Sequence, residues 1–306
     1  MDGPVSDGQM WHSELRLPDG RRLGYAIFGK PTGISILLFH GSPGSRLDGA
    51  LLAQAAEARG ARVIALDRPG TGLSDPQPGR RLADWPADVA AVVDYLDLRQ
   101  PALLGVSAGA AYVYAVCGAM PARVGPVSVV SGVGPPSVLT GAKPALMRLL
   151  LRRTPAFAAA MFNRVAEAAR SDPGSFEPPG FNPADREALA PTGVREAYVA
   201  AFLEAYRSGV DGILQDQSLQ LADWPFDLRS IRQHVHLWHG EFDHVVPVEV
   251  ARRVAASLPD ATLTVVPGAG HLSTLLDQAS AILTDLLDRS AGPHVPADRD
   301  QEPLRA

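Results

Sequence analysis

The sequence is poor in residues that could form covalent or thiolate-based sites. Its 306 residues include one cysteine, Cys117. No disulfide can therefore form within the chain, and no metal site can use several thiolates. Cys117 lies in an Ala-rich apolar segment and is expected to be a small core residue.

Long apolar runs and basic clusters are also missing. No segment is long and apolar enough to suggest a membrane-spanning helix, and the first residues, MDGPVSDGQMW, contain no apolar leader. The net charge is −5 and no Lys/Arg-rich run occurs, which argues against binding to nucleic acid. We therefore expect a cytoplasmic protein without a membrane span, whose partner is a small-molecule substrate.

What the sequence does contain is a regular alternation of short apolar runs and helical patterns. Of the residues, 46% are hydrophobic, and the apolar β-branched runs predict strands at 34–39, 62–67, 101–106, 123–132, 234–240 and 261–266. Ala- and Leu-rich segments predict helices at 48–59, 86–97, 108–119, 247–258 and 272–288. A hairpin is expected over 13–29, with its turn at Asp19-Gly20. The pattern predicts an α/β fold with a mostly parallel, doubly wound sheet.

The alternation stops between Gly132 and Pro225, where three helical patterns are separated by Pro- and Gly-rich breaks such as SDPGSFEPPGFNP. We interpret residues 133–226 as a helical cap inserted into a core formed by 1–132 and 227–290. Residues 291–306 are polar and Pro-rich, and we expect them to be disordered.

The stretch ALLGVSAGAA places a lone serine, Ser107, at the end of a predicted buried strand and directly before a predicted helix. Gly105 and Gly109 lie two residues away on either side. This is the G-x-S-x-G pattern of a nucleophile elbow, where a sharp turn exposes the serine and only tiny neighbours avoid a steric clash. The sequence therefore predicts that Ser107 is a nucleophile.

A serine hydroxyl needs a base, and the base needs a carboxylate that orients it. His271 opens the last predicted helix and is our candidate base, whereas His40 lies in a loop with a different role. Asp243 follows the preceding strand at the same sheet edge and is our candidate acid. Glu241 is its main rival, and Asp216 and Asp223 are weaker ones. The order Ser, Asp, His along the chain is the one found in α/β-hydrolases.

Acyl transfer also needs donors for an oxyanion. We expect the backbone N–H of Ala108, directly after the nucleophile, and that of Ser42, in the small-residue loop HGSPGSR, to supply them. Large apolar side chains recur at helical spacing in the insertion. They form either the insertion's own core or the wall of a substrate pocket, and they are Met147, Phe157, Met161, Phe162, Phe202 and Tyr206.

Two weaker patterns suggest cofactors. The stretch HVHLWHGEFDH is rich in histidine, but its spacing does not match a metal-binding motif, and we interpret these histidines as strand and loop residues. Gly-rich segments such as GTGLS do not form the G-x-G-x-x-G that follows the first strand of a βαβ unit. We expect neither a metal nor another cofactor.

Five motifs occur together in a defined order: FHGSPGSR, DRPGTGLSDP, GVSAGA, HGEFDHVVP and GAGH. In this respect the sequence resembles the α/β-hydrolase superfamily, and in particular its capped branch of esterases, lactonases, proline iminopeptidase-like enzymes and haloperoxidases without a cofactor. The resemblance covers roughly 14–132 and 227–288. It implies a Ser107–Asp243–His271 triad that forms an acyl-enzyme.

The activity expected from this resemblance is hydrolysis of an ester or lactone with a small to medium apolar substrate. The same triad could instead serve thioester, acyl-transfer, cyclisation, C–C cleavage or aminopeptidase chemistry. A ligand receptor without catalysis is a third interpretation, although such receptors usually have a broken triad.

Overall fold

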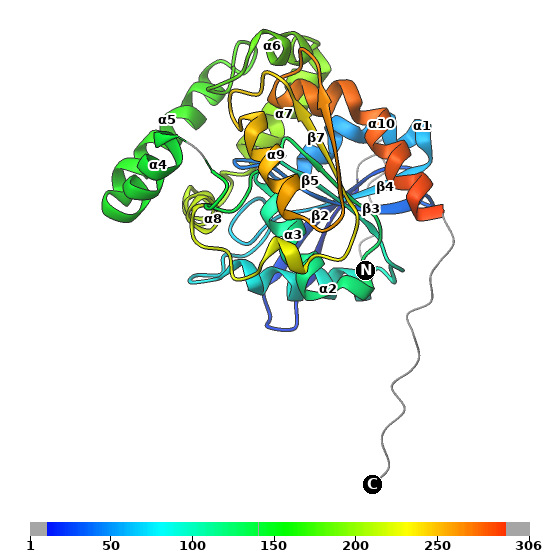
Figure 1. Cartoon of the computed structure of the whole chain (residues 1–306). Coiled ribbons are helices and arrows are strands. Elements are labelled where there is room, and N and C mark those ends of the chain that lie inside the picture. Colours follow the sequence, from blue (N-terminus) through cyan, green and yellow to red (C-terminus); the bar gives the residue numbers. More distant parts are fainter. Residues whose placement is uncertain (1–10, 140, 292–306) are drawn as a thin grey trace.

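The computed structural model describes residues 11–139 and 141–291, and an eight-stranded sheet forms its centre (Figure 1). The strand order is β1-β2-β4-β3-β5-β6-β7-β8. The strands β1 and β2 form the predicted antiparallel hairpin, β2 is also antiparallel to β4, and the other strands pair in parallel. The predicted α/β fold with a mostly parallel sheet is therefore confirmed. The strand bounds are β1 (Trp11–Arg16), β2 (Arg22–Gly29), β3 (Ile34–Phe39), β4 (Ala61–Leu66), β5 (Ala102–Val106), β6 (Val127–Val130), β7 (Val235–Gly240) and β8 (Ala261–Val266).

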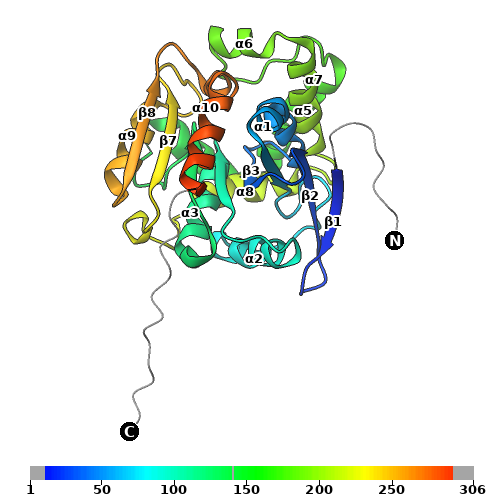
Figure 2. The same ribbon diagram turned by 90° about the vertical axis from the view of Figure 1, so that its right-hand side faces the viewer.

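Helices cover both faces of the sheet and give it two hydrophobic cores (Figure 2). One core packs side chains of α2, α3 and α9 against the strands, and the other packs α1 and α10. Burial on both faces explains why the inner strands are short, continuous apolar runs. The helix bounds are α1 (Ala53–Arg59), α2 (Trp85–Tyr95), α3 (Gly109–Ala119), α9 (Val248–Ser257) and α10 (His271–Ala291).

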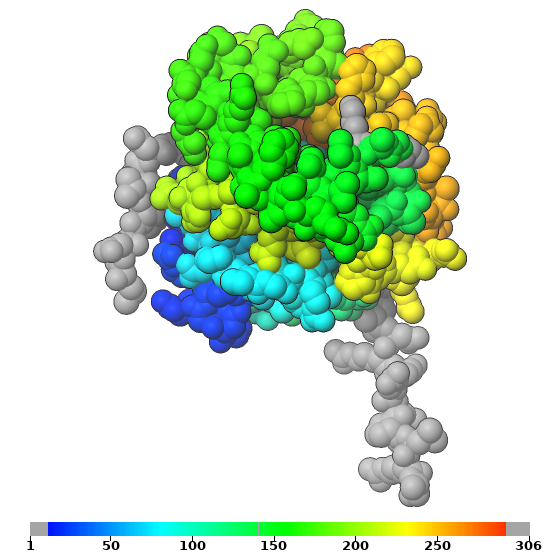
Figure 3. Space-filling view, turned by 90° about the vertical axis from the view of Figure 1, so that its left-hand side faces the viewer, coloured from blue at the N-terminus to red at the C-terminus, as the bar shows by residue number. Residues whose placement is uncertain are grey.

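The segment between β6 and β7 is a helical insertion that contributes no strand. Its helices are α4 (Ala142–Arg153), α5 (Pro155–Ser171), α6 (Pro183–Leu189), α7 (Thr192–Glu204) and α8 (Asp211–Leu221). Buried side chains of α5, of α7 and of residues 205–206 directly after α7 form a separate small core, together with Phe176 and Ile213. Figure 3 views this side of the molecule and shows a hollow between green atoms of the insertion and orange atoms of the C-terminal third of the chain.

Several element bounds differ from the prediction for local reasons. The strand predicted at 123–132 is only Val127–Val130, because a 3₁₀ turn over Pro121–Arg123 precedes it and Ser131 adopts a left-handed φ of 50°. The helix predicted at 48–59 begins as a 3₁₀-helix, η1 (Arg46–Leu52), which Ser45 caps.

Two helices of the insertion, α6 and α8, were not predicted. In α6 the helix start lies within the Pro/Gly-rich break, where Asn182 caps the first turn and Pro183 takes the first helical position. The helix α8 is polar and begins with Asp211-Gly212, so it lacks an obvious apolar period.

Within the described residues, no helix has both the length and the apolar character needed to cross a membrane. The predicted disorder of 291–306 concerns a segment that, from residue 292 on, lies outside the described residues.

Candidate active site

Ser107 occupies the turn between β5 and α3 and has a φ of 52°, a left-handed value that is strained for a residue with a side chain. The two flanking glycines are required sterically. A Cβ at Gly105 would lie 2.6 Å from Val113 Cγ2, and a Cβ at Gly109 would lie 2.0 Å from the carbonyl oxygen of Phe39. The turn is held by Ser107 N–H, which donates to Val130 O at 2.9 Å. This is the backbone geometry that a nucleophile elbow requires.

The loop 40–44 lies directly beside Ser107. Strands β3 and β5 are neighbours with Phe39 paired to Gly105, so the residues that follow both strands meet at one edge. A Cβ built on Gly41 would lie 3.6 Å from Ser107 Cβ. The backbone of Ser42 therefore belongs to the same site as that of Ala108, the buried residue after Ser107.

His271 and Asp243 meet at the end of the next pair of strands. Gly240 of β7 pairs with Val266 of β8, and the loops that follow bring Asp243 Oδ2 to 2.7 Å from His271 Nδ1. The other carboxylate oxygen, Oδ1, accepts the backbone N–H groups of Val245 and Val246 at 2.9 and 2.8 Å. These bonds fix the carboxylate and leave Nε2 as the free nitrogen of the His271 ring.

The charges of this pair support each other. Burial lowers the pKa of His271, but the nearby Asp243 carboxylate and its hydrogen bond outweigh that effect, so the net pKa is raised from its usual 6.5. Burial raises the pKa of Asp243, yet the charge and hydrogen bond of His271 bring it below its ordinary value. Asp243 is therefore ionised at neutral pH and stabilises the imidazolium.

The rival acids have other partners. Glu241 accepts the backbone N–H of Gly268 with Oε2 at 3.1 Å, and Asp223 is an exposed residue of another cavity. Asp216 is fully buried and bonded to Arg68, Arg80 and Tyr112. Of the four acids considered, Asp243 is the one hydrogen-bonded to the His271 ring.

Arg68 holds the loop 40–44 from behind. Its guanidinium donates to the carbonyl oxygens of His40 and Gly41 at 2.6 and 2.7 Å, and its Nε donates to Asp216 Oδ2 at 2.6 Å. Burial raises the pKa of Asp216, but the charges of Arg68 and Arg80 outweigh that effect and bring the pKa below its usual value. Asp216 therefore stays ionised. Because Asp216 belongs to α8, this ion pair joins the insertion to the loop beside Ser107.

Asp185 of α6 holds the start of α10, a role that the sequence did not reveal. Its carboxylate accepts the backbone N–H groups of His271, Leu272 and Ser273 at 3.1, 2.8 and 2.9 Å, and the Ser273 hydroxyl at 2.9 Å. These N–H groups have no acceptor within their own helix. The signal that could have revealed α6 is N-P-A-D, in which Asn182 and Asp185 form a capping box.

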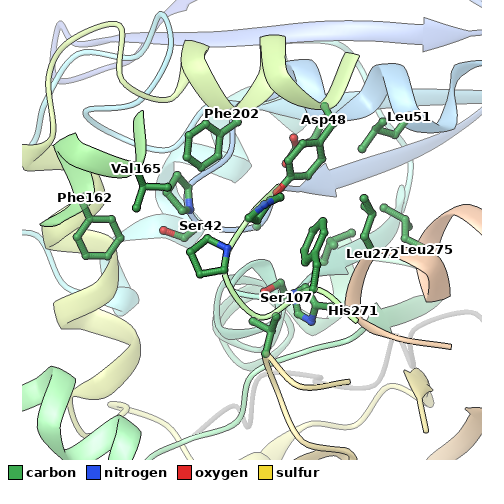
Figure 4. Close-up of a pocket in the computed structure, with 18 of the residues that line it drawn as sticks. Ser42, Asp48, Leu51, Ser107, Phe162, Val165, Phe202, His271, Leu272 and Leu275 are labelled. Carbon is green, nitrogen blue, oxygen red and sulfur yellow. The ribbon is translucent and has the colours of Figure 1, made fainter. Parts of the chain in front are cut away.

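A cavity of about 500 Å³ lies above Ser107 and is lined by the sheet edge, η1 and the insertion (Figure 4). Ser42, Ser107 and His271 contribute to its wall. Of the apolar residues predicted for a pocket, five line it: Met147, Met161, Phe162, Phe202 and Tyr206. Three of these, Phe162, Phe202 and Tyr206, also pack in the insertion's own core, so the two predicted roles coexist.

The prediction that Phe157 belongs to the pocket wall or to the insertion's core is wrong. Its side chain is 61% exposed and does not line the cavity. Phe157 lies four residues before Met161, in the first turn of α5. Helical spacing alone does not reveal which residues along one face of a helix are covered by other parts of the protein.

The histidine-rich stretch has protein partners. His234 Nδ1 lies 2.7 Å from Asp260 Oδ1, His236 Nε2 lies 2.9 Å from Thr264 Oγ1, and His239 Nε2 lies 2.8 Å from Val246 O. Among the residues that the structure describes, no group of three or more His, Cys, Asp or Glu side chains could hold a metal ion.

We predict that Asp185→Asn disturbs His271. An amide keeps one acceptor oxygen, so its NH2 group faces either the N–H of His271 or those of Leu272 and Ser273, and the negative charge near the imidazole is lost. The free energy of unfolding should fall by about 1–3 kcal/mol, and the pKa of His271 should fall because the Asp185 charge raises it. Thermal melting and NMR titration of the imidazole would measure the two effects.

The matched control for this variant is Glu187→Gln on the same helix, because Glu187 is exposed. That change should leave both melting and the His271 titration nearly unaltered. A normal His271 titration in the Asp185 variant would contradict the electrostatic link.

Comparisons with known proteins agree with this geometry. A model of the Alpha/beta hydrolase family matches residues 36–285. A non-heme chloroperoxidase from Streptomyces lividans is 31% identical over 257 residues, which cover 83% of this chain and 90% of the relative. Among solved structures, a bromoperoxidase from Bacillus anthracis has a TM-score of 0.71 at 20% identity and covers 90% of this chain and 99% of that one. An esterase from Exiguobacterium antarcticum has a TM-score of 0.69 at 18% identity, with 90% and 98% covered. The chain belongs to the alpha/beta hydrolase family.

Proposed function

We propose that this protein is a serine hydrolase that cleaves a carboxylic ester or lactone through an acyl-enzyme, with Ser107, His271 and Asp243 as its triad. The observation that carries the proposal is the 2.7 Å contact between His271 and the buried Asp243 carboxylate, at a cavity whose wall also contains Ser107. Membership of the alpha/beta hydrolase family supports the same reaction class.

In the proposed reaction the hydroxyl of Ser107 attacks the carbonyl carbon while His271 Nε2 takes its proton. The negative charge that develops on the carbonyl oxygen is held by the backbone N–H groups of Ala108 and Ser42. Collapse of the tetrahedral intermediate expels the alcohol, which receives the proton from His271. Water then attacks the acyl-serine with His271 again as base, and the acid leaves with Ser107 restored.

Two features of the site favour catalysis over simple ligand binding. The left-handed φ of 52° at Ser107 is a strained geometry, and such strain is concentrated at functional positions. The paired pKa shifts of His271 and Asp243 keep a base and its counter-charge together, an arrangement that a receptor does not need.

The first test concerns the nucleophile. Ser107→Ala should lower hydrolysis of p-nitrophenyl butyrate by several orders of magnitude, because the triad acts as a unit. Folding should be kept, since alanine retains the Cβ of serine and removes only the hydroxyl. Labelling with a fluorophosphonate should be lost in parallel. Residual activity above about a tenth of the parent, in an assay free of contaminating esterases, would disprove the assignment.

A second test separates Asp243 from Glu241 and uses pH. Asp243→Asn should reduce kcat by about 10³–10⁴, whereas Glu241→Gln, which alters only the contact with Gly268, should change it little. In the parent, kcat/KM should rise as His271 loses its proton, with a midpoint above the usual 6.5, because the pKa of His271 is raised. Equal losses in the two variants would contradict the role of Asp243.

A third test concerns the wall of the cavity. Activity on linear p-nitrophenyl esters should climb by about fourfold per added methylene, since each buried methylene contributes about 0.8 kcal/mol, until the cavity is full. Met161→Ala should move the best chain length upward because Met161 lines the cavity. Phe157→Ala, on the same helix but exposed, is the matched control and should leave the profile unchanged. An equal shift in both variants would place the substrate elsewhere.

A further inference from the structure

The cavity wall contains one carboxylate that the proposed mechanism does not use. Among the described residues that line the cavity, the polar side chains are those of Ser42, Ser107, Tyr198, Tyr206, His271 and Asp48. Most of the remaining wall consists of leucine, valine, methionine, proline and phenylalanine side chains. Asp48 is thus an acid in a predominantly apolar chamber (Figure 4).

Asp48 belongs to η1, and its carboxylate lies against the loop 40–44. A Cβ added at Gly44 would lie 2.6 Å from Asp48 Oδ2 and 2.9 Å from Gly41 O, so the glycine leaves the space that the carboxylate occupies. The carboxylate therefore lies beside Gly44 and the backbone of Gly41, the residue before Ser42, and it lines the same cavity as Ser42.

The neighbouring cations are already engaged elsewhere. Arg46 pairs with Asp67 at 2.8 Å and with Glu204 at 2.7 Å. Arg68 is shared between Asp216 and two backbone carbonyl groups. In the described part of the chain, no side chain donates a hydrogen bond to the Asp48 carboxylate or forms an ion pair with it. This distinguishes Asp48 from Asp67, Asp185, Asp216 and Asp243, each of which has several donors.

The environment leaves this carboxylate under-solvated. Burial raises the pKa of Asp48 to about 7, against the opposing influence of Arg68 and the Gly41 backbone amide, and with a further upward contribution from Asp67. Asp48 is half-buried, and its carboxylate has the Gly41 backbone amide beside it but no side-chain donor. A partly desolvated carboxylate that is short of donors is stabilised by a ligand that supplies one. A site built in this way discriminates strongly against analogues without the donor.

We propose that Asp48 determines the substrate specificity of the cavity by accepting a hydrogen bond from a hydroxyl or ammonium group of the substrate. The substrate class is then an ester or lactone that carries such a donor within reach of the reacting carbonyl, rather than a pure hydrocarbon ester. This inference rests on the proposed function for the identity of the cavity as the substrate site. Binding itself does not depend on turnover, and it is therefore what the test measures.

The test uses full-length Ser107→Ala protein and three probes of similar size, n-hexylammonium, 1-hexanol and methyl pentyl ether. Dissociation constants come from ligand-observed NMR titration at pH 8, where Asp48 is mainly ionised. The ammonium or the alcohol, or both, should bind about tenfold or more tightly than the ether, as expected for a hydrogen bond to a charged group. Equal affinities for all three probes would overturn the proposal.

Two substitutions at Asp48, each added to the Ser107→Ala protein, separate the donor types. Asp48→Leu removes the acceptor and should abolish every preference over the ether. Asp48→Asn keeps an acceptor oxygen without the charge, so it should reduce the ammonium preference and keep that for the alcohol. An ammonium preference that is lost in both variants indicates charge recognition, and an alcohol preference that is lost only in Asp48→Leu indicates hydroxyl recognition.

Leu51→Ala is the matched control, because Leu51 also belongs to η1 and lines the same cavity. It should change the affinity for all three probes by a similar factor. A donor preference that persists in Asp48→Leu would show that another group recognises the donor and would overturn the proposal. If near-UV circular dichroism shows that Asp48→Leu is unfolded, Asp48→Ala, which also removes the acceptor, takes its place, and a donor preference that persists in it counts against Asp48.

Discussion

The first N–H groups of a helix have no acceptor within that helix, and in α10 three of them point to one carboxylate, that of Asp185. Asp185 is fully buried and belongs to α6, a short helix of the insertion. Its negative charge also suits the positive end of a helix dipole. The first residue of α10 is His271, so this contact fixes the backbone from which the proposed base projects.

The close packing around this carboxylate leaves little freedom. A Cβ at Gly270 would lie 2.4 Å from Asp185 Oδ2 and 2.5 Å from Asn182 Oδ1. Asn182 in turn donates to the carbonyl oxygen of Phe242, the residue before Asp243. A single turn of the insertion therefore contacts the backbone on both sides of the Asp243–His271 pair. The insertion acts as a structural part of the site as well as its cover.

Asp216 of α8 connects the insertion to the loop 40–44, as Asp185 connects it to the start of α10. It binds Arg68, which holds two carbonyl oxygens of that loop, and it accepts the Tyr112 hydroxyl of α3 at 2.7 Å. Such a buried ionic network carries a desolvation cost, so its presence is weak evidence for added stability. Here it specifies where α8 sits relative to the loop and to the helix that follows Ser107.

The sequence predicted the parts of the site that depend on local geometry. Ser107 between two glycines, and Asp243 and His271 after neighbouring strands, follow from a turn and a sheet edge whose steric demands involve nearby residues. Asp185 and Asp48 could not be predicted in this way. Asp185 acts on a helix 86 to 88 residues further along the chain. The role proposed for Asp48 depends on its having no side-chain donor among the described residues. The contacts of Asp185 and the surroundings of Asp48 both arise from the packing of segments that are distant in the sequence.

The same distinction explains the outcome for the apolar residues of the insertion. Helical spacing groups Phe157 with Met161, yet one is exposed and the other lines the cavity. Whether such a residue is exposed or lines the cavity depends on which elements pack against its helix. α4 contacts α5 and α8, whereas α6 and α8 are tied to the core by Asp185 and Asp216. Among the described residues, no ion pair joins α4 or α5 to the triad or to the loop 40–44, and the ion pair of α7 is with Arg46 of η1. Changes in Met147 or Met161 can alter the size of the chamber while the anchored helices keep the proposed catalytic groups in place.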